Sequence, residues 1–125
     1  MLGFNFKKLA PNFKFAFSGI KTIIQEKQPF RIMIISAILV IVAMICFNLT
    51  LIHKIIILFM IVLVLSLELL NSVVEKLLDF ICPQKNGKVK KIKDMSAGVV
   101  LIASIGAALI GILIFLPYIL EILFR

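Results

Sequence analysis

Apolar residues dominate three long stretches of the chain, at about residues 30–52, 55–82 and 93–116. Each stretch is long enough to cross a bilayer as a helix, which takes about 20 predominantly apolar residues. The pattern therefore predicts an all-α integral membrane protein, with three transmembrane helices in a single domain over residues 1–125. We expect all four prolines to mark helix boundaries, because proline lacks the N–H that a helix interior needs.

A shorter amphipathic pattern precedes the first span, over about residues 12–28. Phe13, Phe17, Ile20 and Ile24 recur at helical spacing and share one face. The segment is too short and too charged to span, so we expect a helix in the membrane interface with this stripe against acyl chains. A helix packed on another protein surface is the alternative.

The second apolar stretch has a polar face near its end. Glu68, Asn71, Glu75 and Asp79 fall within an arc of roughly 80° on a helix. A carboxylate at the centre of a membrane helix costs roughly 2.5–3.5 kcal/mol on insertion scales. Glu68 lies about 21 Å and Glu75 about 31 Å into the span, so we expect Glu68 inside the membrane and Glu75 at its boundary. A helix end that emerges into water is the alternative explanation.

One chain of three apolar helices should not readily shield this polar face from lipid, so the face argues for an oligomer or a bound ligand. The third span offers a line of small residues suited to close helix packing, Ala103, Ala107 and Gly111.

The distribution of charge predicts the orientation in the membrane. The chain is 62% hydrophobic with a formal charge of +8, and its basic residues gather before the first span and between the second and third. Positive residues mark the cytoplasmic side, so we expect a cytoplasmic N-terminus and an external C-terminus. Such residues usually hold anionic headgroups. Nucleic acid is not an expected partner, because no soluble domain would present them.

Two polar clusters meet at one depth, the face over residues 68–79 and the pair Lys93-Asp94 at the start of the third span. Carboxylates without His or Cys partners suit Mg²⁺ rather than zinc, and a lysine beside them suits a phosphate. Glu68, the most deeply placed, could take a proton from a lipid hydroxyl. The set fits phosphoryl transfer to a membrane alcohol. The sequence has no Walker-type loop, kinase Gly-rich loop or G-x-S-x-G elbow.

The chain resembles the prokaryotic diacylglycerol kinase and undecaprenol kinase family over nearly its whole length. Its E-x-x-N-[ST]-x-x-E motif places Glu68, Asn71 and Glu75, and a second motif is Lys93-Asp94 followed by Met-Ser-Ala-Gly-Val-Val-Leu. The resemblance implies a homotrimer in the bacterial inner membrane, with active sites between protomers at the cytoplasmic interface. It also implies ATP as co-substrate, Mg²⁺ as cofactor and a membrane lipid as acceptor.

The same resemblance implies roles for individual residues. Glu68 would be the general base, and Glu75 would be a metal ligand. The remaining members of the site would be the nucleotide contacts Glu75, Lys93 and Asp94 and the supporting residues Asn71 and Asp79.

The chain departs from the family at one position. The family has a metal-binding glutamate three residues before the Phe30-Arg31 pair, and here that position is Lys27. Glu26 lies one residue earlier, with Pro29 between it and Phe30. A local helix distortion at Pro29 would bring Glu26 into place, so we expect Glu26 to be the metal ligand of the surface helix.

The segment after Lys93-Asp94 is more similar to the Ala-Gly-Ala-Val-Leu version of undecaprenol kinases than to the Gly-Ser-Ala-Ala-Val version of enterobacterial diacylglycerol kinases. Undecaprenol is therefore the expected acceptor, and diacylglycerol, which would give phosphatidic acid, is the alternative. A function of another class also stays open, a small transporter or accessory subunit that uses Glu68 for proton coupling. It would leave Lys93-Asp94 unexplained.

Overall fold

The computed structural model describes residues 3–125, and within them all regular structure is helical. Helix α1 spans Phe6–Glu26, α2 spans Gln28–Cys46, α3 spans Leu51–Ile81 and α4 spans Gly87–Leu123. Helices α2, α3 and α4 are each long and apolar enough to cross a membrane. The predicted all-α fold with three candidate spans is therefore confirmed.

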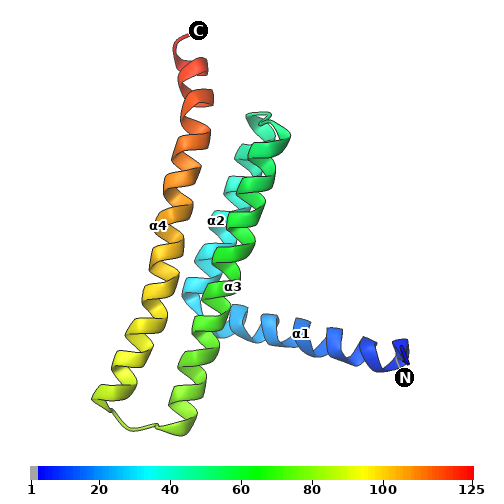
Figure 1. The fold of residues 1–125 in the computed structure, drawn as a ribbon, viewed down its shortest axis with the longest axis vertical. Helices are drawn as coiled ribbons and strands as arrows, with labels where there is room; N and C mark the ends of the chain where they lie inside the picture. Colours follow the sequence, from blue (N-terminus) through cyan, green and yellow to red (C-terminus); the bar gives the residue numbers. More distant parts are fainter. Residues whose placement is uncertain (1–2) are drawn as a thin grey trace.

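Helix α3 is the centre of the bundle. It packs against both α2 and α4, whereas α2 and α4 make no close backbone contact with each other within residues 3–125. α2 and α3 form a hairpin, α4 runs beside α3, and α1 projects sideways where α2 begins (Figure 1). We call the end with residues 47–50 the hairpin end and the end with residues 82–86 the loop end. α3 and α4 both continue past α1 at the loop end.

The junction between α1 and α2 is explained by Pro29. Because proline has no N–H, it cannot bond to the carbonyl of Gln25, and α1 ends at Glu26. The guanidinium of Arg31 supplies the missing donor, with Nη1 at 3.0 Å from the Gln25 oxygen and 3.2 Å from the Ile24 oxygen. The chain turns at Lys27, which has extended dihedral angles. The direction of α1 is thus held by a side chain of α2.

The apolar core lies toward the hairpin end, where Met44, Leu49, Ile57 and Ile114 are buried together. The tight connection there passes through Asn48, whose φ of 52° lies in the left-handed region that Asn tolerates. The only histidine, which belongs to α3, contacts α4 next to this core: its Nδ1 lies 3.2 Å from the Tyr118 hydroxyl. This core lies apart from the buried polar side chains of α3, which are nearer the loop end.

Two prolines correct the expectation that all four mark helix boundaries. Pro29 and Pro83 do, but Pro11 lies inside α1 and Pro117 inside α4. A single missing N–H is tolerated at Pro11 because α1 is exposed there, and membrane helices tolerate proline where neighbouring groups replace the lost bond. Helices α1 and α4, which contain these two prolines, are therefore longer than predicted.

Helix α1 begins at Phe6, before the predicted start near residue 12, because the Asn5 side chain caps it by accepting a bond from the Lys7 N–H at 3.1 Å. Helix α4 extends past the predicted range 93–116 at both ends, while α2 ends at Cys46.

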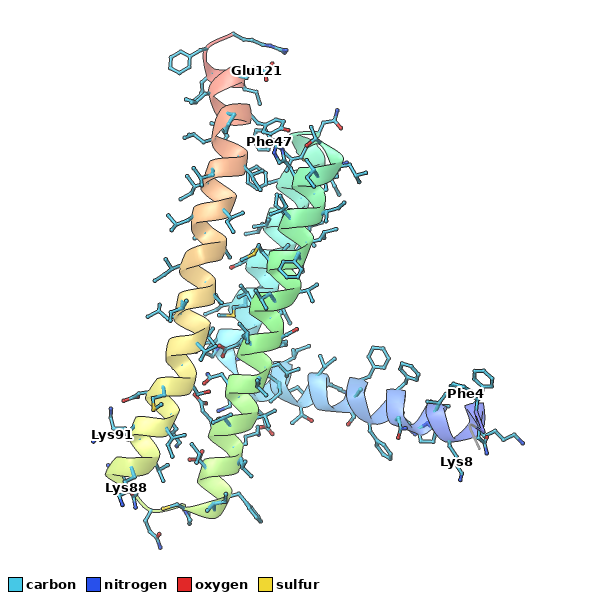
Figure 2. All side chains as sticks on the ribbon, in the orientation of Figure 1. Phe4, Lys8, Phe47, Lys88, Lys91 and Glu121 are labelled. Carbon is cyan, nitrogen blue, oxygen red and sulfur yellow. The ribbon has the colours of Figure 1, made fainter. Side chains whose placement is uncertain are left out.

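Helix α1 exposes Phe13, Phe17 and Ile20 of its apolar stripe, while Ile24 is partly buried. Phe4 and Lys8 lie near the free end of α1, far from the other helices (Figure 2). That the stripe contacts acyl chains at the membrane interface stays a prediction.

Candidate functional site

The polar face of α3 lies in the half of the bundle nearer the loop end. Glu68 is 5% exposed and Asn71 is 7% exposed within a single chain. The expectation that one chain cannot shield these groups is therefore wrong for Glu68 and Asn71, because α3 is covered by both α2 and α4. Glu75 is partly exposed and lies two turns nearer the loop end, about 10 Å along the helix. The two carboxylates thus occupy different environments on one face.

The groups around Glu68 leave one acceptor without a partner. The Ser72 hydroxyl donates to the Glu68 carbonyl at 3.0 Å, so it is satisfied by its own helix. The Asn71 amide nitrogen lies 3.5 Å from Glu75 Oε1, but its buried Oδ1 has no partner among the described residues. An unpaired buried oxygen is costly unless something else meets it. The Asn71 Oδ1 atom can therefore accept a hydrogen bond from a ligand or bind a cation.

Two ion pairs join the junction of α1 and α2 to α3. Lys27 Nζ lies 3.0 Å from Glu75 Oε2, and Glu26 pairs with Lys76. Both doublets run from acid to base along the chain, so they pair crosswise, each acid with the base of the other doublet. The structure brings Lys27, rather than Glu26, to Glu75. That Glu26 binds a metal stays a prediction, and it requires the Glu26 carboxylate to leave Lys76.

The Lys93-Asp94 pair at the start of α4 is divided between two partners. Lys93 Nζ lies 2.5 Å from Asp79 Oδ1 and so bridges α4 to α3. The Asp94 carboxylate lies 2.7 Å from Lys90 Nζ, one turn earlier on its own helix. Lys93 is therefore at the site, whereas Asp94 faces solvent in this arrangement.

The donor set fits a metal that arrives with its own ligands. No group of three His, Cys, Asp or Glu side chains that could hold a metal occurs within residues 3–125. The Glu75 carboxylate and the unpaired Asn71 oxygen offer oxygen atoms only, which suits Mg²⁺. Since Mg²⁺ commonly takes one or two carboxylates plus substrate phosphates, this set fits a Mg²⁺–phosphate complex.

Lys27 and Lys76 are the members of the site that the sequence analysis missed as contacts. A signal was present, because Glu26-Lys27 and Glu75-Lys76 are adjacent acid–base doublets. The doublets could be paired only once the direction of the chain at Lys27 was known.

Comparison with known proteins agrees with the motifs. A family model described as prokaryotic diacylglycerol kinase matches residues 14–115. A Synechocystis sp. protein named diacylglycerol kinase is 32% identical over 121 residues, which cover 93% of this chain and 69% of the relative. A Bacillus subtilis protein named undecaprenol kinase is 42% identical over 52 residues, which cover 42% of each chain. The family match includes α2 and α3 completely, most of α1 and α4, and every residue of the polar face, and the chain therefore belongs to the prokaryotic diacylglycerol kinase family.

Proposed function

We propose that the protein is a lipid kinase that transfers the terminal phosphoryl group of ATP to the hydroxyl of a membrane lipid alcohol. The observation that supports this most strongly is the burial of Glu68 in a membrane-length helix, beside an unpaired amide oxygen. A carboxylate held at this depth is costly to keep for packing alone. Family membership gives the reaction class.

Glu68 acts as general base in this proposal. Its carboxylate takes the proton of the lipid hydroxyl while the oxygen attacks the terminal phosphorus of ATP, and ADP leaves. Asn71 stands one turn from Glu68 and close to Glu75, so it can orient the reacting groups.

Glu75 would hold Mg²⁺, with Asn71 Oδ1 and Glu26 as further oxygen donors. Bound Mg²⁺ would offset the charge of the phosphates during transfer. Lys93 would leave Asp79 to contact a phosphate, and Asp94 would complete the nucleotide contacts.

The lipid acceptor is proposed to be undecaprenol, on the motif after Lys93-Asp94, with diacylglycerol as the second candidate. One relative is named for each lipid, so the names do not choose between them. Purified protein with labelled ATP and a panel of lipid alcohols tests both. Transfer to undecaprenol in excess of diacylglycerol is expected. No transfer to either lipid by folded protein would contradict the kinase proposal and favour a proton-coupled transporter.

We further propose a homotrimer with the loop end in the cytoplasm. The exposed apolar sides of the three spans and the lysines of the loop end support this arrangement. Reporter fusions at Arg125 and in the 85–91 loop should report opposite sides of the membrane. The same compartment for both would contradict the orientation.

A further inference from the structure

Each oxygen of the Glu75 carboxylate faces a nitrogen donor of the same chain. Lys27 Nζ lies 3.0 Å from Oε2, and Asn71 Nδ2 lies 3.5 Å from Oε1. The side chains of Lys27 and Glu75 are 26% and 32% exposed, so water screens their attraction less than at an open surface. A divalent cation that binds Oε2 must therefore replace the Lys27 ammonium.

The backbone of Lys27 is fixed while its side chain can move. The Lys27 N–H donates to the Ile23 carbonyl at 2.8 Å, and the Lys27 carbonyl accepts from the Arg31 N–H at 3.3 Å. Arg31 also holds the carbonyls at the end of α1. An ammonium released from Glu75 stays beside the site, because the flexible lysine stem starts from a fixed point.

We propose that Lys27 is an internal counter-cation of Glu75, that it gives way to Mg²⁺ only when the metal arrives with a nucleotide, and that its ammonium then binds a nucleotide phosphate. The inference rests on the proposed function, since it assigns Glu75 to Mg²⁺ and the site to a nucleotide. It assigns the enzyme a preference for the metal–nucleotide complex over the free metal.

The preference follows from charge. If Mg²⁺ alone takes Glu75, the Lys27 ammonium loses its partner and lies next to a doubly charged cation, which repels it. A partly buried ammonium without a partner is costly. If the metal brings a polyphosphate, the ammonium gains a phosphate oxygen in place of the carboxylate. Lys27 therefore opposes the binding of Mg²⁺ alone and supports the binding of Mg²⁺ together with a nucleotide.

The experiment measures equilibrium binding to the full chain in bilayers, without turnover. The probes are MgCl₂ alone, and MgCl₂ with a non-hydrolysable ATP analogue, each titrated by calorimetry. The test variant is Lys27→Met, which keeps the stem and removes the charge, and Lys27→Arg restores a cation. The control is Lys91→Met, which also removes one positive charge. Lys91 lies near the loop end of α4, and its side chain points away from α3 (Figure 2).

Lys27→Met should bind Mg²⁺ alone about tenfold more tightly and the Mg²⁺–analogue about tenfold more weakly, as expected for one charged contact. Lys27→Arg and Lys91→Met should keep both affinities within about threefold of the parent. Unchanged affinity of Lys27→Met for Mg²⁺ alone, or for the Mg²⁺–analogue, would overturn the inference and leave Lys27 as a structural tie. A loosened junction would not raise metal affinity. Failure of the parent protein to bind the analogue would overturn the proposed function as well.

Discussion

Lys93 of α4 and Asp79 of α3 are joined by an ion pair, with Nζ at 2.5 Å from Oδ1, one turn beyond Glu75 on the same face of α3. The pair ties the start of α4 to the end of α3, at the point where the connecting loop separates the two helices. In the proposed enzyme Lys93 binds a phosphate, so Asp79 holds the lysine at the site until a nucleotide arrives. Substitution of Lys93 and substitution of Asp79 should therefore affect nucleotide affinity differently.

Lys93→Met should weaken nucleotide binding about tenfold or more, because a cationic contact to phosphate is lost. Asp79→Asn keeps the lysine and removes its resting partner, so nucleotide affinity should stay within about threefold of the parent. Binding of a non-hydrolysable ATP analogue with Mg²⁺ would measure both. Lys91→Met serves as control for the charge, because the Lys91 side chain lies near the same end of α4 and points away from α3 (Figure 2).

A larger loss of affinity in Asp79→Asn than in Lys93→Met would show that Asp79, and not Lys93, meets the nucleotide complex. Equal and small losses in both variants would mean that the pair only fastens α3 to α4.

Glu26 tests whether the surface helix contributes a metal ligand. If Glu26 binds Mg²⁺, Glu26→Gln should raise the Mg²⁺ concentration for half-maximal activity about tenfold, since a charged contact to the metal is lost. Lys76→Met should act in the opposite direction, because it releases Glu26 from its ion pair. Titration of activity with MgCl₂ at saturating ATP is the measurement. If the Mg²⁺ dependence of Glu26→Gln matches the parent while Glu75→Gln is inactive, the site does without Glu26.

The spans and the polar face of α3 could be predicted because both depend on periodicity along one helix. Glu68, Asn71 and Glu75 share a face wherever that helix is placed, so no tertiary information was needed. Their burial inside one chain could not be predicted, because it depends on α2 and α4 covering α3 from two sides. Shielding of the polar face therefore does not argue for an oligomer at Glu68 and Asn71, because a single chain already buries both residues.

The contacts of Glu26 and Lys27 could not be predicted for a different reason. Both lie where the chain leaves one helix and enters another, and the direction there depends on Pro29 and on the Arg31 cap. A shift of one residue at this junction exchanges which charge meets Glu75. The family resemblance, with a helix distortion at Pro29, favoured Glu26 for the site, whereas the structure places the Lys27 ammonium against the Glu75 carboxylate.

Glu68 and Glu75 should separate catalysis from binding, because they lie about 10 Å apart along one face of α3. Glu68 is buried, while Glu75 is partly exposed and paired with a cation. Glu68→Gln keeps the shape of the side chain but cannot accept a proton. The rate should therefore fall by roughly 10²–10⁴, the usual contribution of general acid–base catalysis. Affinity for the Mg²⁺–nucleotide complex should change little.

Glu75→Gln should instead lower both turnover and Mg²⁺–nucleotide affinity, because it removes the proposed metal ligand. The matched control is Glu121→Gln, a carboxylate near the hairpin end of α4, which is far from the polar face and pairs with Arg125. All three variants need turnover, analogue affinity and thermal stability measured side by side. Glu68→Gln should be as stable as the parent or more stable, because it removes a carboxylate from the membrane. Near-normal turnover in Glu68→Gln, or a large loss of Mg²⁺–nucleotide affinity in that variant alone, would show that the roles of the two carboxylates are assigned wrongly.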